Sequence, residues 1–152
     1  MKRRVKYEAR PPMLVIRGLV NDKLETRERI AVEAIIGGWG DESHYQTLAD
    51  MQGVMLLAGC TSDARKWAKD YAHTILGPVL CKIRDRYLRS GKMTCTTGER
   101  EILRGFVTRY REFWARQPIE LYETACHALQ DHYNRMAAQH EAHQQESTHE
   151  PA

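Results

Sequence analysis

The fold is decided by Ser62–Tyr133, which reads SDARKWAKDYAHTILGPVLCKIRDRYLRSGKMTCTTGEREILRGFVTRYREFWARQPIELYETACHALQDHY. Its apolar residues recur every three to four positions, which is the period of an amphipathic α-helix and not of a β-strand. Ser90-Gly91 and Pro118 break this pattern and divide the stretch into three consecutive helices. The first of these contains Gly77-Pro78, and because proline removes a backbone hydrogen bond, we expect a kink near residues 74–77.

Two more helices are expected ahead of this stretch. The first spans about residues 24–36 and ends at Gly37–Gly40, where glycine allows the backbone to leave the helix. The second starts at Ser43 and ends near Ala58. Ser43 and Thr96 are each followed three residues later by Gln or Glu, which is the spacing of a helix-capping box. Both are therefore predicted to cap the helices that follow them.

The sequence as a whole predicts an all-α protein, a bundle of about five helices formed by residues 24–137. Residues 1–23 are interpreted as an extended basic arm, because the Pro11-Pro12 pair disfavours a helix there. Residues 138–152 are interpreted as a disordered polar and acidic tail, because they show no apolar face. A length of 152 residues is typical of one domain.

Composition indicates a cytoplasmic protein with no membrane partner. The longest apolar runs, Met13–Ile16 and Val54–Ala58, are far too short to span a bilayer. The basic start of the chain is not followed by an apolar stretch of signal-peptide length. The cysteines form no C-x-x-C pair, so free thiols are expected and no metal site is predicted. The four cysteines are Cys60, Cys81, Cys95 and Cys126.

No arrangement typical of catalysis stands out. Cys126 and His127 are adjacent, but neighbours on a helix point about 100° apart and cannot form a nucleophile–base pair. Gly37–Gly40 lacks the lysine and the preceding strand of a phosphate-binding loop. His140 and His143 would share a face of a helical tail and could hold a metal weakly, but a solvated tail is the favoured interpretation. The prediction is a non-enzymatic protein without a cofactor.

The clearest binding signal is a group of cations. The end of the third helix carries three of them on one face, the following turn carries one, and the next helix begins with two. If these helices pack antiparallel, all six meet at one end of the bundle, where they would suit a phosphate backbone or an acidic protein surface. The plainer interpretation is a solvated face with interleaved acidic residues. The six are Lys82, Arg86, Arg89, Lys92, Arg100 and Arg104.

The arm and the first loop supply further candidates. Residues 1–23 carry a net charge of +5 and residues 130–152 carry −3, so the arm could contact phosphates or the protein's own acidic tail. The tryptophan of the glycine-rich loop is either a plug of the core or an exposed binding aromatic, and the plug is the favoured interpretation. The candidates here are Lys2, Arg3 and Arg4 in the arm and Trp39 in the loop.

Six short runs carry a family resemblance: Ile36–Gly40, His44-Tyr45, Leu48–Asp50, Ile83–Tyr87, Gly98-Glu99 and Phe113–Gln117. Together they resemble small uncharacterised helical proteins of proteobacterial phages and prophages. The resemblance covers roughly residues 24–122. It implies a gene of a mobile element whose product acts in the cytoplasm of the bacterial host cell, and it carries over no catalytic residues.

Three functions are weighed on this basis. The leading hypothesis is a non-enzymatic phage or mobile-element protein that binds a host macromolecular complex, foremost a protein complex such as a defence system, and modulates or inhibits it. The first alternative is a nucleic-acid-binding accessory or regulatory protein that uses the arm and the cations of the third and fourth helices. The second alternative is a self-assembling structural module, a homo-oligomer, because tyrosine and tryptophan are abundant on the helical stripes.

Overall fold

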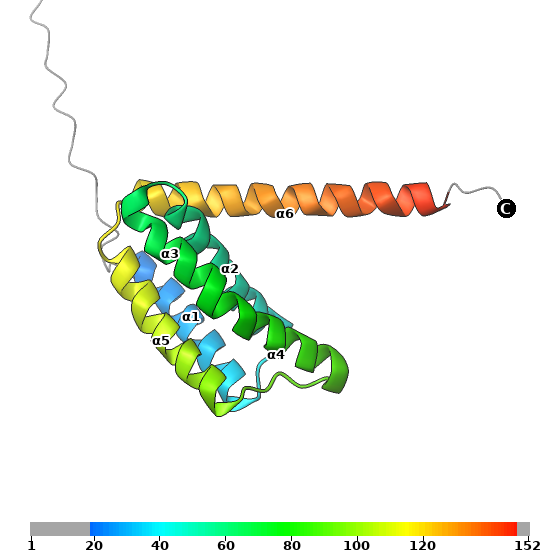
Figure 1. The fold of residues 1–152 in the computed structure, drawn as a ribbon, viewed down its shortest axis with the longest axis horizontal. Coiled ribbons are helices and arrows are strands. Elements are labelled where there is room, and N and C mark those ends of the chain that lie inside the picture. Colours follow the sequence, from blue (N-terminus) through cyan, green and yellow to red (C-terminus); the bar gives the residue numbers. More distant parts are fainter. Residues whose placement is uncertain (1–18, 149–152) are drawn as a thin grey trace, which may run out of the picture.

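The computed structural model describes residues 19–148. Every regular element in this range is helical, which confirms the predicted all-α fold (Figure 1). A short 3₁₀ turn, Asp63–Arg65, and a π-helical turn, Ala72–Leu76, accompany six α-helices. These helices are α1 (Leu19–Gly37), α2 (Glu42–Gly59), α3 (Lys66–Tyr71), α4 (Gly77–Ser90), α5 (Thr97–Trp114) and α6 (Ile119–Thr148).

Helices α3 and α4 form one rod with the π-helical turn between them, so the described residues contain the five predicted helices. The π-helical turn directly precedes Gly77-Pro78, where the distortion is expected. The carbonyl of Ala72 accepts the N–H of Gly77, and it also accepts the side-chain amide of Gln52 at 2.9 Å. The second bond comes from α2 and therefore fixes the distorted turn against the neighbouring helix.

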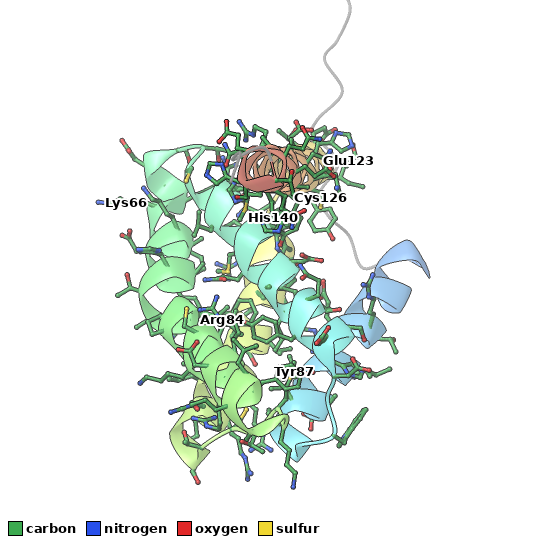
Figure 2. All side chains as sticks on the ribbon, turned by 90° about the vertical axis from the view of Figure 1, so that its right-hand side faces the viewer. Lys66, Arg84, Tyr87, Glu123, Cys126 and His140 are labelled. Carbon is green, nitrogen blue, oxygen red and sulfur yellow. The ribbon has the colours of Figure 1, made fainter. Side chains whose placement is uncertain are left out.

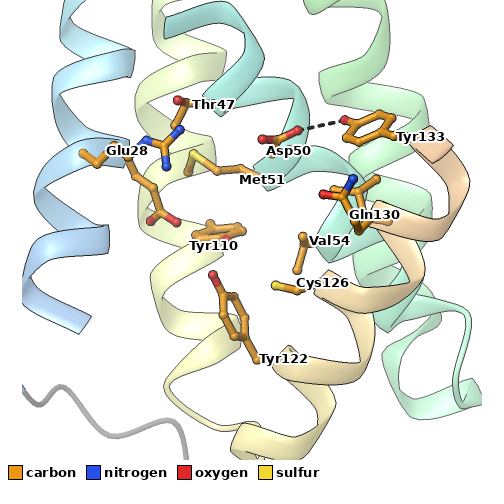
Figure 3. Close-up of a pocket in the computed structure, with 12 residues that line it drawn as sticks. Glu28, Thr47, Asp50, Met51, Val54, Tyr110, Tyr122, Cys126, Gln130 and Tyr133 are labelled. Carbon is orange, nitrogen blue, oxygen red and sulfur yellow. Dashed lines mark hydrogen bonds between the residues drawn. The ribbon is translucent and has the colours of Figure 1, made fainter. Parts of the chain in front are cut away.

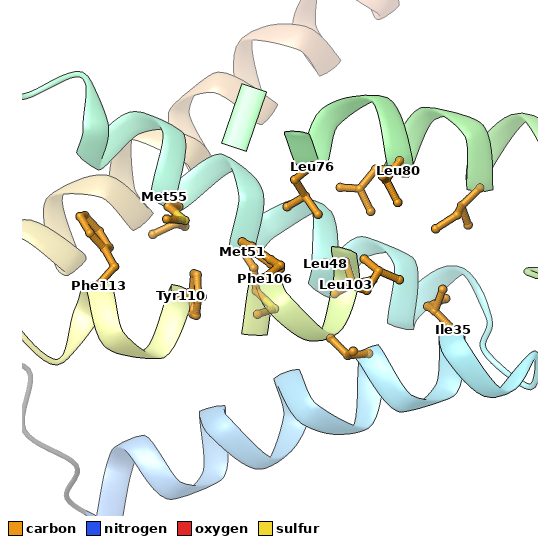
Figure 4. Close-up of a cluster of buried hydrophobic side chains, with 14 of the residues drawn as sticks. Ile35, Leu48, Met51, Met55, Leu76, Leu80, Leu103, Phe106, Tyr110 and Phe113 are labelled. Carbon is orange, nitrogen blue, oxygen red and sulfur yellow. The ribbon is translucent and has the colours of Figure 1, made fainter. Parts of the chain in front are cut away.

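Helix α2 is central to the packing, because it contacts α1, α3, α6 and the π-helical turn. Helix α5 packs against α1 and the same turn. The buried apolar side chains of these helices form one continuous core, and burying them supplies the main driving force for folding (Figure 4). The largest fully buried side chains are Phe106, Ile35, Leu48, Met55, Leu76, Ile83, Leu103 and Val32.

Helix α6 lies across one end of the bundle and extends beyond it (Figure 1). Ala125 and Leu129 are its buried residues, whereas every residue of 134–148 is exposed. Figure 2 looks along this projecting part, on which His140 is labelled. The predicted disordered tail is therefore wrong for residues 138–148, which continue the helix. These residues are rich in alanine, glutamine and glutamate, and their high helix propensity sustains the helix without a buried face.

Helix α1 begins at Leu19, earlier than the predicted start near residue 24. Residues 19–23 thus belong to a helix and not to the arm. Glycine and proline are poor helix formers, and none of residues 19–36 is either one. The helix can therefore begin directly after Gly18. The arm cations Lys2, Arg3 and Arg4 lie outside the described residues.

Asp41 caps helix α2, and the prediction that Ser43 does so is wrong. The Oδ1 atom of Asp41 accepts the N–H groups of Ser43 at 2.9 Å and His44 at 3.2 Å, and the Asp41 N–H donates to His44 Nδ1 at 3.0 Å. A carboxylate is a strong acceptor and also complements the positive end of the helix dipole. The second predicted cap is confirmed, since Thr96 Oγ1 accepts the Glu99 N–H at 3.3 Å.

The close packing of α2 on α3 leads to a prediction at Gly59. A Cβ atom added there would lie 2.3 Å from the backbone nitrogen of Lys69 and 2.8 Å from its Cα. Because backbone atoms cannot move aside as a side chain can, Gly59→Ala is expected to lower the free energy of unfolding by about 1–3 kcal/mol. Gly105 of α5 has open space around it, so Gly105→Ala is expected to raise that energy by about 0.5–1 kcal/mol. Urea unfolding measures the free energy of unfolding of both variants. Equal changes in the two would contradict the close approach of Gly59 to the Lys69 backbone.

Candidate functional site

The end of α4 and the start of α5 lie at the end of the bundle away from α6 (Figure 1). They and the segment between them carry Arg86, Arg89, Lys92 and Arg100, whereas Lys82 and Arg104 lie further along the two helices. Five of the six are exposed, so their side chains are accessible to a partner. These five residues, Lys82, Arg89, Lys92, Arg100 and Arg104, are called the basic end below. Helices α4 and α5 are not among the closely packed pairs of described helices, so the expected gathering of all six cations by antiparallel packing is not borne out.

Arg86 is held differently from the other five. Its Nη2 atom lies 2.7 Å from Glu99 Oε1 and 3.2 Å from Oε2, and its Nη1 atom donates to the carbonyl of Thr94 at 2.5 Å. Glu99 is only 5 % exposed, and its carboxylate raises the pKa of Arg86. Arg86 therefore ties α4 to the start of α5, and the expectation that it serves a partner is corrected to a structural role.

An exposed leucine, Leu88, lies next to Arg89 near the end of α4. It is 73 % exposed, more than any other large hydrophobic side chain of the described residues. It follows Arg84, labelled in Figure 2, by about one helical turn and directly precedes Arg89. Leu88 belongs to no motif, and its one signal in the sequence is that it lies outside the buried stripe of α4. An exposed apolar side chain with a charged surround is typical of the centre of a protein interface.

Trp39 is 61 % exposed in the connection between α1 and α2, so its interpretation as a core plug is wrong. Its ring packs edge-on against His44, with centroids 5.5 Å apart. It also lies over Gly37, where an added Cβ would come within 2.8 Å of the indole. The indole is thus held in place by local contacts while most of its surface faces solvent, as a binding aromatic requires.

The cysteines are free, as expected from their spacing, and two of them are buried or half-buried. Burial raises the pKa of the Cys95 thiol to about 11 and also raises the pKa of Cys126. Both are therefore neutral thiols at physiological pH, and a thiol is a much weaker nucleophile than a thiolate. Within residues 19–148, no group of three or more His, Cys, Asp or Glu side chains is placed to hold a metal ion.

A cavity of about 210 Å³ lies between α1, α2, α5 and α6 (Figure 3). Each helix contributes polar side chains to it, among them Glu28 from α1, Asp50 from α2, Tyr110 from α5 and Tyr122 from α6. These residues are far apart in the sequence and belong to no motif, so the sequence analysis gave no reason to group them. The cavity is a second candidate site.

Glu28 has an unusual environment in this cavity. Burial raises its pKa from near 4.5 to about 7, and a hydrogen bond with Tyr110 and the charge of Arg27 oppose that rise. Burial also raises the pKa values of Tyr110 and Tyr122, so both phenols stay protonated. Glu28 therefore exchanges its proton near neutral pH, whereas the two tyrosines act as neutral hydrogen-bonding groups.

Comparison with protein families, curated proteins and solved structures finds no match to this chain. Among the helices that the structure describes, none has the length and apolar content needed to cross a bilayer. A functional interpretation therefore depends on the basic end, on Leu88 and Trp39, and on the cavity.

Proposed function

We propose that this chain is a non-enzymatic interaction protein of phage or mobile-element origin, which binds a host protein complex in the cytoplasm and modulates or inhibits it. The proposed contact surface is the basic end. The observation that carries the proposal is the exposure of Leu88, at 73 %, directly before Arg89 of the basic end. An apolar side chain that is costly to leave in water gains most from a partner that covers it.

The chemistry of the basic end indicates what kind of partner fits. A protein interface generally has an apolar centre and a polar rim, and a few central residues supply most of the binding energy. Leu88 would be such a centre, and Arg89 and Lys92 are cations close to it in the chain. The matching surface on the partner is acidic with an apolar pocket. Opposite charges on the two surfaces would speed association and fix their orientation.

The non-enzymatic part of the proposal is supported by the state of the cysteines. Cys95 and Cys126 have raised pKa values because they are buried, which keeps them in the weakly nucleophilic thiol form. Cys126 hydrogen-bonds with the phenol of Tyr122 and not with a base that could activate it. Neither cysteine is therefore activated as a nucleophile.

Nucleic acid is the second candidate partner, and the observation in its favour is the set of five exposed cations at the basic end. If all five contact phosphates, the logarithm of the affinity falls with the logarithm of salt concentration with a slope of roughly −4. Leu88 argues against this candidate, since an exposed leucine gains nothing from a phosphate backbone. A protein partner would give a weaker dependence on salt.

The class of partner can be tested by affinity capture. The tagged chain is incubated with lysate of a proteobacterium, with and without nuclease, and retained proteins are identified by mass spectrometry. We expect a discrete protein complex to be retained equally under both conditions. Retention that disappears after nuclease treatment would contradict the proposal and favour the nucleic-acid candidate.

A further inference from the structure

The cavity between α1, α2, α5 and α6 has carboxylates on two of its sides. Figure 3 shows the side chain of Glu28 reaching from α1 toward Tyr110, and Asp50 of α2 beside Tyr133, with Met51 between the two acids. Helix α6, which lines one side of the cavity, lies across the end of the bundle away from the end of α4 and the start of α5 (Figure 1). An inference about it therefore goes beyond the proposed function and does not depend on it.

The carboxyl group of Glu28 lacks a full electrostatic partner. It hydrogen-bonds with Tyr110, and Arg27 lies close enough to favour its charge, but the net effect of its surroundings is to disfavour ionisation. The Arg27 side chain is exposed, and solvent weakens its influence. Burial destabilises the ionised form of Glu28, and a cation inside the cavity would stabilise that form.

Asp50, on the other side, keeps one oxygen available. Tyr133 donates to its Oδ1 atom at 2.8 Å, and the side-chain amide of Gln46 donates to the same atom at 2.8 Å. The Oδ2 atom accepts no hydrogen bond from the described side chains. Two donors thus fix the orientation of this carboxylate, and its second oxygen is left for a ligand.

The lining between the two acids is apolar and aromatic. Met51 and Val54 of α2 and Leu129 of α6 line the cavity together with three tyrosines. Such a surface suits methylene groups, and tyrosine rings attract cations through their π-electrons. The cavity of about 210 Å³ is larger than an engineered cavity of about 150 Å³ that holds benzene, so it has room for a ligand with about six non-hydrogen atoms.

We propose that this cavity binds a short aliphatic diamine, with one ammonium group at Glu28, the other at Asp50, and the methylene chain against Met51 and Val54. Each ammonium group then has a carboxylate partner, and the apolar middle of the ligand is covered by apolar side chains. The size of the cavity, the two separated acids and the apolar lining all agree with this class of ligand. A negatively charged or fully apolar ligand would leave both carboxylates without compensation.

Calorimetric titration of the full chain with 1,4-diaminobutane at pH 8 tests the proposal. We expect saturable binding of one molecule per chain. Glu28→Gln and Asp50→Asn are each expected to weaken binding at least tenfold, because each removes one charge partner while conserving shape. Glu33→Gln, on the exposed face of the same helix as Glu28, is the matched control and is expected to bind like the unaltered chain.

Two further ligands separate the proposed contacts from general attraction of charge. Butylamine, with one ammonium group, is expected to bind at least tenfold more weakly than the diamine, and 1,4-butanediol, which is neutral, is expected not to bind. The proposal is overturned if the diamine shows no saturable binding, if the Glu28 and Asp50 variants bind it like the control, or if the diol binds equally well.

The effect of pH on this binding follows from the groups around Glu28. It is faced by Arg27 on its own helix, by Asp50 on α2, by Tyr110 on α5, and by Tyr122 on α6. Cys126 of α6 also lines the cavity. At pH 5.5 Glu28 is mostly protonated, so diamine affinity is expected to fall by at least threefold relative to pH 8. In Glu28→Gln this fall should be smaller, and an equal fall would contradict the placement of an ammonium group at Glu28.

Discussion

Replacing Arg86 with methionine is expected to lower the free energy of unfolding by about 2–3 kcal/mol, because it leaves the buried carboxylate of Glu99 without its half-buried charge partner. Glu99 is 5 % exposed and lies 2.7 Å from Arg86, so solvent cannot replace the lost contact well. The same change removes the bond to the Thr94 carbonyl, which holds the segment between α4 and α5. Urea unfolding monitored by circular dichroism at pH 7 measures the loss.

Two companion variants identify the cause of that loss. Arg100→Met removes an exposed cation from the start of α5 and is expected to change stability by no more than about 0.5 kcal/mol. The double variant Arg86→Met with Glu99→Leu removes both charges and is expected to regain most of the stability that the single variant loses. A single Arg86 variant as stable as the Arg100 variant would show that the ion pair does not hold the two helices together.

Raising the pH from 5 to 8 is expected to reduce the contribution of Glu28 to stability by about 2–3 kcal/mol. The pKa of Glu28 is about 7 in the folded protein and near 4.5 in an unfolded chain. Between these values the folded state keeps a proton that the unfolded state has released. The stability that Glu28 contributes is therefore present at low pH and is lost as the pH rises through 7. Well above pH 7 this contribution no longer changes with pH.

Comparison with Glu28→Gln isolates this contribution from other titrating groups. The glutamine variant is neutral at every pH, so its advantage in stability over the unaltered chain should be less than about 1 kcal/mol near pH 5 and about 3 kcal/mol near pH 8. Glu33→Gln, at an exposed position of the same helix, should follow the unaltered chain throughout. Parallel pH profiles for the unaltered chain and the Glu28 variant would mean that Glu28 is not buried as described.

Helix α5 shows how far periodicity alone predicts this fold. The helix buries Leu103, Phe106, Tyr110 and Phe113, which recur at the spacing of three to four residues that predicts an amphipathic helix here. Thr96 caps the same helix as predicted. Both features depend on residues within a few positions of one another, so a local pattern in the sequence contains them.

Contacts between distant residues are not contained in such patterns. The ion pair of Arg86 with Glu99 depends on how α4 meets α5, and the hydrogen bond of Glu28 with Tyr110 joins the first and fifth α-helices of the chain. The prediction that Trp39 plugs the core was wrong because a residue in a loop belongs to no periodic pattern that would show whether its side chain is buried. The six cations were predicted as a group, but the pairing of Arg86 with Glu99 could be found only in the folded structure.

The proposed role of the basic end is tested most directly by partner capture with two matched variants. Leu88→Asp places a charge at the centre of the proposed surface, and Met136→Asp places the same charge at an exposed apolar position of α6. Both sites are exposed, at 73 % and 53 %, so neither change should unfold the protein. We predict that Leu88→Asp reduces nuclease-resistant retention of the partner at least tenfold, whereas Met136→Asp retains it fully. Equal retention by both variants, or loss with Met136→Asp alone, would contradict binding through the basic end.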